Sequence, residues 1–303
     1  MTFRFSGHET FPCRYAWLPK AYAALEHEPQ TFSDEEAAMI QLGVGKNMVR
    51  AIRFWVHTAG VAVPRPAGGY EVTPFGRAVL KRNGFDPFLE DIQTLWLIHW
   101  QLSTHVEEPL FAWDYVLNRW QGAEISRSAL MRVFTKEAER LERPLSQVTL
   151  EQHFDTFLHT YVATRSRKGE IQEDNLDCPL VELELIQAAG ERRVDSTGRR
   201  ETIYVFRRDE KPEISPALFA YCVDSYWRQR KPHEKTLSFR DVTVAQGSPG
   251  QIFKLPEWNI RQRLETIEAD TDGAFRYRDS ATLPQLSRGN ESDRRDLLAA
   301  IYS

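Results

Sequence analysis

The amino-terminal segment contains residues whose types suit acid–base chemistry on a phosphate. His8 and Glu9 are adjacent, and Arg14 follows a few residues later. Hydrolysis of a phosphodiester needs an activated nucleophile and positive charge against the phosphate oxygens. In that chemistry His8 acts as the general base, Glu9 orients it or binds a metal ion, and Arg14 holds the phosphate. The alternative is structural, with Glu9 and Arg14 forming an internal ion pair that fixes this segment.

Carboxylates farther along the chain are candidates for a magnesium site. Asp86 and Glu90 lie four positions apart, followed by Asp91 and then His99. Residues at that spacing share one face of a helix, so the carboxylates of Asp86 and Glu90 could bind the same Mg²⁺. The alternative is that these acids complement the positive end of a helix dipole.

A third acidic group and several missing signatures limit the chemistry further. The third group contains Glu173, Asp174 and Asp177. These acids either take part in catalysis or form an exposed acidic turn. No HNH-type histidine pair and no restriction-type acidic-x-Lys core is visible. The segment Gly43–Asn47 departs from the P-loop pattern in its glycine spacing and in its final residue, so we expect no bound nucleotide. The histidines have neither an HExxH spacing nor cysteine partners, so we expect no zinc.

Residues 46–59 form the clearest binding element, because their pattern predicts an amphipathic helix with a basic face. At 100° per residue, Lys46, Arg50, Arg53 and His57 fall within about 60° of one another, and Asn47 adjoins them. The apolar residues cluster on a different face. A recognition helix in the major groove of DNA needs this division. The alternative is a surface helix that happens to carry basic residues.

The neighbouring elements place this basic helix in a winged helix-turn-helix. Residues 33–42 are predicted to form a helix in which Ser33 caps the first turn and Glu36 completes a capping box. A turn at 43–45 leads into the basic helix, and short strands follow at 61–63 and 70–73. Arg65 lies in the turn between these strands, where it could reach a DNA phosphate.

The rest of the chain is predicted to be mainly helical, with a mixed carboxyl-terminal part. The overall class is therefore mainly α or α+β, in three domains. These are a winged helix-turn-helix at 1–85, an acidic helical domain at 86–190 and a mixed α/β segment at 191–303. In the central part we expect helices at 107–120, 126–141 and 147–164, then a strand at 180–187. A hairpin around residues 192–206 and helices at 215–229, 256–268 and 292–302 follow.

Composition and charge favour a cytoplasmic protein with a polyanionic partner. The net charge of the 303 residues is −4, yet residues 42–85 hold seven basic residues against Glu71 alone. No apolar run is long enough to span a membrane, and the amino terminus lacks the apolar core of a signal peptide. The three cysteines are far apart in the sequence, which fits free thiols in a reducing compartment.

Several motifs resemble those of a bacterial family of unknown function that is associated with DNA phosphorothioation defence modules. The resemblance covers most of the chain and is most specific in its first two motifs. The motifs are Phe5-Ser6-Gly7-His8-Glu9-Thr10-Phe11-Pro12 with Arg14, Tyr15, Trp17 and Leu18; Leu42-Gly43-Val44-Gly45-Lys46-Asn47-Met48-Val49 with Ile52-Arg53-Phe54-Trp55; Asp86-Pro87 with Glu90-Asp91 and Leu95-Trp96-Leu97; and Asp174-Asn175-Leu176-Asp177 with Pro179-Leu180.

The resemblance implies a role on DNA. Members of that family are regarded as the nickase of the single-strand phosphorothioation system, encoded beside a sulfurtransferase, a cysteine desulfurase and an ATPase. It implies a DNA nicking endonuclease that cuts or presents one strand of duplex DNA for sulfur modification in antiviral defence. Mg²⁺ is expected from the chemistry of phosphodiester cleavage, in which carboxylates often hold this ion. The alternative is a non-enzymatic regulator, or a scaffold whose acidic middle docks a partner enzyme. A helical toxin- or antitoxin-like protein without a DNA role is a third interpretation.

Overall fold

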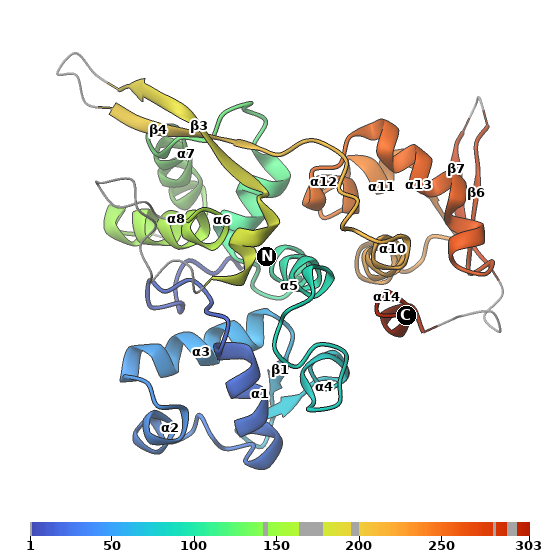
Figure 1. Cartoon of the computed structure of the whole chain (residues 1–303). Coiled ribbons are helices and arrows are strands. Elements are labelled where there is room, and N and C mark those ends of the chain that lie inside the picture. Colours follow the sequence, from blue (N-terminus) through green and yellow to red (C-terminus); the bar gives the residue numbers. More distant parts are fainter. Residues whose placement is uncertain (1, 142–144, 164–177, 195–199, 281–282, 290–295) are drawn as a thin grey trace.

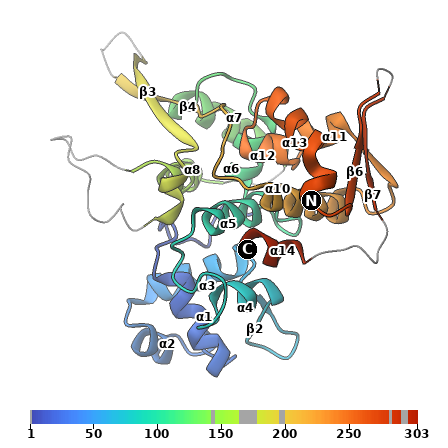
Figure 2. The same cartoon turned by 45° about the vertical axis from the view of Figure 1, so that its right-hand side comes forward.

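The computed structural model describes residues 2–141, 145–163, 178–194, 200–280, 283–289 and 296–303. Helices predominate in this part of the chain, and its strands form three small antiparallel sheets. The mainly α and α+β class predicted from the sequence is confirmed. Figures 1 and 2 show three groups of elements arranged around helix α5 (Ile92–Thr104).

The amino-terminal group consists of helices and one short hairpin. Its elements are α1 (Trp17–His27), α2 (Glu35–Leu42), α3 (Lys46–Thr58), β1 (Ala62–Pro64), β2 (Tyr70–Val72) and α4 (Pro74–Leu80). The cap predicted for α2 is wrong by one residue, because Asp34 rather than Ser33 accepts the backbone N–H groups of Glu36 and Ala37. Gly43 has a φ of 66°, and its left-handed conformation ends α2 and redirects the chain into α3.

The central group surrounds α5 with helices and a long hairpin. It contains α6 (Phe111–Asp114), η1 (Tyr115–Arg119), α7 (Arg127–Arg140), α8 (Gln147–Tyr161), η2 (Pro179–Leu183), β3 (Ile186–Arg193) and β4 (Arg200–Phe206). The strand expected at 180–187 is wrong in its first half, because residues 179–183 form a 3₁₀ helix. The expected hairpin is present, and Figure 1 shows β3 and β4 projecting away from the helices.

The carboxyl-terminal group mixes helices with a three-stranded sheet of order β5-β7-β6. Its elements are α10 (Pro216–Arg230), β5 (Thr236–Ser238), α11 (Phe239–Thr243), α12 (Pro249–Phe253), α13 (Glu257–Asp270), β6 (Phe275–Arg278), β7 (Gln285–Arg288) and α14 (Leu297–Ile301). The predicted start of α10 is confirmed: the side chain of Ser215 caps the helix, and Pro216 occupies its first position.

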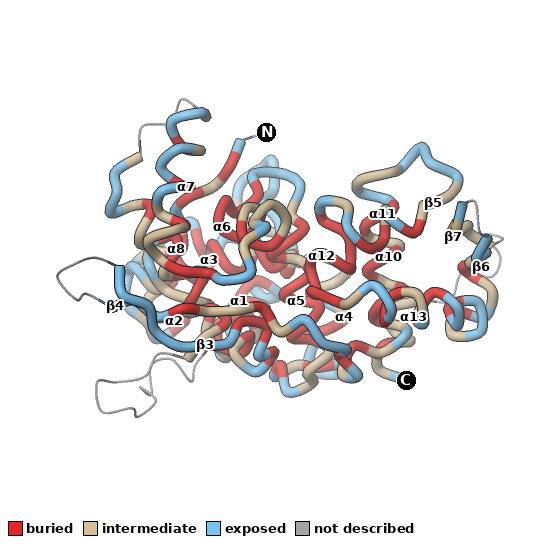
Figure 3. The backbone as a smooth tube through the Cα atoms, turned by 90° about the horizontal axis from the view of Figure 1, so that it is seen from above, coloured by how far each residue is buried: buried red, intermediate tan, exposed pale blue. Residues whose placement is uncertain are grey.

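One connected apolar core runs through all three groups. Trp55 of α3 packs edge-on against Trp113 of α6, with ring centroids 6.0 Å apart. Trp96 and Trp100 of α5 both contact Phe253 of α12. Figure 3 shows α5 largely buried at the centre, with the β3–β4 hairpin exposed. The core therefore crosses both domain boundaries proposed from the sequence, which stay predictions.

None of the described helices has the length and apolar character needed to cross a membrane.

Candidate nucleic-acid interface

Helix α3 has the two faces that its sequence predicts. Val49, Ile52 and Trp55 are buried against the core. Lys46 and Asn47 are exposed at the amino-terminal end of the helix. Farther along the same side, the partly exposed residues are Arg50, Arg53 and His57. The helix thus presents cationic donors to solvent while its apolar face holds it on the protein.

Part of this positive charge is offset by an acid on the neighbouring helix. Glu35 accepts hydrogen bonds from Arg50 Nε at 2.8 Å and Arg50 Nη2 at 3.2 Å, and Lys46 Nζ lies 3.1 Å from the same carboxylate. These contacts lower the pKa of Glu35 to about 2, chiefly through the hydrogen bond from Arg50. Arg53 has no hydrogen bond or ion pair to any described residue, so its full charge is available.

A small hollow of about 130 Å³ lies between residues 4–9 and α3. It is lined by Arg4, Gly7, Glu9, Arg50, Arg53, Phe54, His57 and Tyr70. The structure therefore brings Glu9, predicted as a catalytic residue, together with Arg50 and Arg53, predicted to contact DNA. The amino-terminal segment is pressed against the helix here: a Cβ added to Gly7, whose φ is 109°, would lie 2.8 Å from Phe54 Cδ2. The glycine permits both this approach and this backbone conformation.

His8, in contrast, is only 3% exposed and contacts the central group. Its Nε2 atom lies 3.1 Å from His153 Nδ1. Its Nδ1 atom lies 3.1 Å from the amide of Thr10 and 3.2 Å from the hydroxyl of Thr156. Burial lowers the pKa of His8 to about 4. These contacts tie the amino-terminal segment to α8, and a catalytic role for His8 stays a prediction that requires this ring to become accessible.

The hydrogen bonds define the tautomer of His153 and place competing demands on His8. The amide of Ala112 donates to His153 Nε2 at 3.0 Å, so a neutral His153 carries its proton on Nδ1 and donates it to His8 Nε2. Accepting that proton leaves His8 with its own proton on Nδ1, where the hydroxyl of Thr156 could accept it. The amide of Thr10 donates to the same Nδ1 atom, so this contact favours the other neutral tautomer of His8, with the proton on Nε2. Both rings are neutral in this arrangement.

Arg14 lies over aromatic rings. Its guanidinium carbon is 5.5 Å from the ring centroid of Trp17 and 5.9 Å from that of Phe11. This is cation–π geometry, which fixes the side chain against α1. The hollow that contains Glu9 does not include Arg14.

The helical spacing expected for Asp86 and Glu90 is wrong. These residues precede α5, and Leu89 between them has a φ of 59°. Asp86 is 5% exposed, and its two carboxylate oxygens accept the backbone N–H groups of Glu90 at 2.9 Å and Asp91 at 3.0 Å. The carboxylate of Asp86 therefore stabilises the turn before α5 instead of sharing a helix face with Glu90.

The remaining acidic and histidine candidates are not assembled into a metal site. No three His, Cys, Asp or Glu residues in the described part of the chain are arranged to bind a metal ion. His99 is fully buried, with Nδ1 2.8 Å from the Tyr161 hydroxyl and Nε2 3.1 Å from the Ile252 carbonyl oxygen. The acidic group at 173–177 lies outside the described residues. Arg65 is exposed in the turn between β1 and β2, as expected.

Sequence reasoning missed Arg4, although a signal was present. Phe3 and Phe5 are buried, and both contact the ring of Phe111. Side chains alternate between the two sides of an extended segment, so the side chain of Arg4 points away from the side on which Phe3 and Phe5 are buried. There the guanidinium of Arg4 lies 5.3 Å from the ring centroid of Phe54, beside the hollow.

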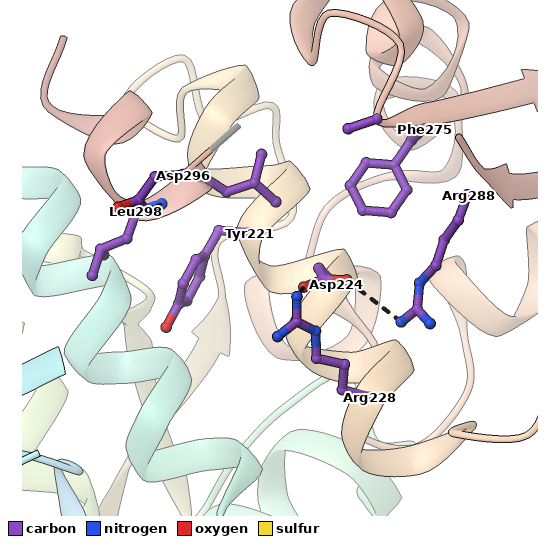
Figure 4. Close-up of a pocket in the computed structure, with 9 residues that line it drawn as sticks. Tyr221, Asp224, Arg228, Phe275, Arg288, Asp296 and Leu298 are labelled. Carbon is purple, nitrogen blue, oxygen red and sulfur yellow. Dashed lines mark hydrogen bonds and ion pairs between the residues drawn. The ribbon is translucent and has the colours of Figure 1, made fainter. Parts of the chain in front are cut away.

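A second cavity, of about 230 Å³, lies among α10, the β6–β7 sheet and α14 (Figure 4). Asp224 of α10 lines this cavity, and Arg228 and Arg288 lie 2.6 Å and 3.4 Å from its carboxylate. Tyr221 and Phe275 line the cavity from different elements. Because Asp224 already binds both guanidiniums, this cavity presents less uncompensated charge than the hollow at α3, which we take as the candidate site.

Comparison with known proteins finds relatives over nearly the whole chain. A family described as "Protein of unknown function (DUF4007)" matches residues 5–302. A structure described as "Magnesium ion-bound SspB crystal structure" matches with a TM-score of 0.78 and 26% identity, and one described as "SspB crystal structure" with 0.79 and 24%. Each match covers 95% of this chain and 83% of the other chain, and the second is informative for the fold alone. The comparison with curated proteins gives no match.

Proposed function

The chain belongs to the DUF4007 family, and we propose that it is a DNA-binding component of a bacterial phosphorothioation module that nicks or presents one DNA strand. The similarity to SspB, a phosphorothioation-system protein, over 95% of this chain is the observation that carries the proposal. The association agrees with the one that the sequence motifs imply. Its partners are then duplex DNA and the sulfurtransferase, cysteine desulfurase and ATPase of such a module.

We propose that residues 1–85 act as a winged helix-turn-helix domain, with α3 as the recognition helix. The order of α2, a short turn, α3 and the β1–β2 hairpin supports this assignment. The exposed basic face of α3 supports contact with DNA through Lys46, Asn47, Arg50 and Arg53. Arg65, in the turn of the hairpin, would contact an adjacent phosphate.

Cleavage of one DNA strand by this chain itself is the most specific part of the proposal. A magnesium-bound SspB structure among the similar proteins is compatible with a Mg²⁺-dependent reaction. The described residues do not form a three-ligand site, so we derive no metal-dependent step. The exposed basic face of α3 fits equally a second candidate function, a DNA-binding scaffold or regulator that leaves chemistry to a partner enzyme.

Incubation with supercoiled plasmid, with and without Mg²⁺, separates the two candidates. Conversion to open circles that requires the metal and is lost in Glu9→Gln supports the nickase. Duplex binding without cleavage supports the scaffold.

Binding is tested by the double variant Arg50→Ala and Arg53→Ala, with Arg276→Ala in the carboxyl-terminal group as control. Fluorescence anisotropy should report weaker duplex binding and a shallower dependence on salt, because each lost phosphate contact lowers the slope of log K against log[salt] by about 0.9. Unchanged affinity and slope would remove α3 from the DNA interface.

A further inference from the structure

The hollow between residues 4–9 and α3 combines groups from two separate parts of the chain. Arg4 forms one side of the hollow, and hydrogen bonds to the segment that leads into α6 hold its backbone in place. The Arg4 N–H donates to the Pro109 carbonyl oxygen at 3.0 Å, and the Arg4 carbonyl oxygen accepts from the Phe111 N–H at 3.0 Å. Arg53 and His57, one helical turn apart, form the other side. All three side chains line the same cavity.

Positive charge exceeds negative charge in this hollow. Its lining includes three guanidiniums and one carboxylate, that of Glu9. Glu35 compensates Arg50 from outside, and Glu108 lies 3.7 Å from Arg4 with its side chain 59% exposed. Ion pairs this exposed contribute little, so Glu108 can be displaced by a stronger anion. Arg53 has no partner among the described residues.

His57, which lines the hollow, and His105, which contacts His57, each have a buried ring nitrogen without a hydrogen-bond partner among the described residues. His57 and His105 meet edge-on, with centroids 5.5 Å apart, and the Nδ1 atom of each is buried without a partner in the described part of the chain. Buried polar atoms are normally paired, so an unpaired one calls for a missing ligand or water. The charged groups that act on this pair are Arg4, Glu107 and Glu108.

We propose that this hollow binds a single backbone phosphate of DNA through Arg4, Arg53 and His57. Its 130 Å³ is well below the roughly 300 Å³ at which small-molecule pockets begin, which fits a phosphate group better than a nucleoside. Guanidinium groups are the preferred ligands of phosphate oxygens. The inference rests on the DNA binding proposed above, and it adds the amino-terminal segment to an interface otherwise made by α3 and the hairpin.

Phosphate binding should be coupled to protonation of His57. In the free protein the pKa of His57 is lowered by burial, by His105 and by Arg4. A phosphate beside the ring favours the imidazolium, so the bound state takes up a proton. Duplex affinity should therefore rise as the pH falls from 7.5 to 6, and His57→Gln should reduce that rise.

Salt titrations of three variants test the shared phosphate. Arg4→Gln and Arg53→Gln should each weaken duplex binding about 3- to 10-fold. Because both residues bind one phosphate, the double variant should lose about 0.9 from the salt slope, whereas contacts to two phosphates would lose about 1.8. Arg4→Lys, which keeps the charge, should retain the slope, and Arg276→Gln should behave as the parent chain.

The outcomes separate this inference from the proposed function. Parent-like binding by Arg4→Gln, or a double-variant slope loss near 1.8, would overturn the shared phosphate while DNA binding stands. Absence of duplex binding by the parent chain would overturn both. Thermal stabilisation by inorganic phosphate at constant ionic strength, lost in Arg4→Gln but without any effect of Arg4→Gln on DNA affinity, would identify a free-phosphate site and contradict a DNA contact.

Discussion

Glu35 controls how much of the charge on α3 is available to DNA. Its carboxylate binds both Arg50 and Lys46, and any phosphate that approaches these cations must compete with it. A single carboxylate can therefore set the affinity of the interface without touching DNA. The same pairing holds Arg50 in a fixed orientation, which reduces the side-chain entropy lost when it binds a ligand.

We predict that Glu35→Gln strengthens duplex binding about 3- to 10-fold and steepens its salt dependence by about 0.9 for each cation that gains a phosphate. Glu36→Gln is the matched control, since Glu36 is a neighbouring exposed acid of α2. Anisotropy titrations over a range of NaCl concentrations measure both quantities. Equal gains in the two variants would reflect net charge alone and would contradict a specific effect of Glu35.

The buried His8 predicts a loss of stability in mild acid. The pKa of His8 is about 4 in the folded chain and near 6.5 when unfolded. Between these values the unfolded chain binds a proton that the folded chain does not, so the free energy of unfolding falls as the pH decreases from about 6.5 to 4. Burial depresses the pKa of His153 as well, which acts in the same direction.

Urea unfolding at pH 7 and pH 5 measures this effect. The parent chain should lose about 1 to 2 kcal/mol between the two conditions through His8. His8→Gln should be less stable at pH 7, because it disrupts the contact with His153, but should lose less on acidification. An equal loss in both proteins would mean that His8 is not the titrating group.

At the scale of single elements, the sequence predicts what depends on near neighbours. The faces of α3, the cap of α10 and the β3–β4 hairpin follow from periodicity and turn residues, and all are observed. The turn at 86–91 was missed because Pro87 and the left-handed Leu89 interrupt a spacing that looks helical.

Contacts between distant segments could not be read in the same way. His8 meets His153, 145 residues away, and Glu9 meets the basic face of α3 in one hollow. Tertiary packing decides these contacts, and no local spacing encodes them. The sequence therefore assigns Glu9 to a catalytic site and Arg53 to a separate DNA-binding site. In the structure both residues line the same hollow.

The cap of α2 provides a test at this scale, because two adjacent residues compete for the role. Asp34→Ala should lower the free energy of unfolding by about 1 kcal/mol, since it removes hydrogen bonds to the amides of Glu36 and Ala37. Ser33→Ala should have a much smaller effect, because its hydroxyl contacts Gln30 instead. Chemical denaturation measures both, and the reverse order would restore the cap expected from the sequence.

At the scale of the whole molecule, Lys254 joins the carboxyl-terminal group to the central one. It ends α12 and is 4% exposed. Its ammonium donates to the Leu117 carbonyl oxygen of η1 and lies 4.4 Å from the ring centroid of Phe206 at the end of β4. Burial lowers the pKa of Lys254 to about 7. One titratable group therefore lies where three elements from two parts of the chain meet.

The buried Lys254 predicts a second change of stability with pH, at higher pH than the change predicted for His8. An unfolded lysine has a pKa near 10.4, so between about pH 7 and 10.4 the unfolded chain binds one more proton than the folded chain. The free energy of unfolding therefore rises with pH across this range, and the stability that neutral Lys254 contributes is lost as the pH falls towards 7. The parent chain should therefore gain about 1 to 2 kcal/mol relative to Lys254→Met between pH 7.5 and 9.

Lys235→Met, at an exposed position, is the control, and urea unfolding at both pH values gives the comparison. If the parent and Lys254→Met curves run parallel, Lys254 keeps its proton throughout and the junction is not titrated in this range.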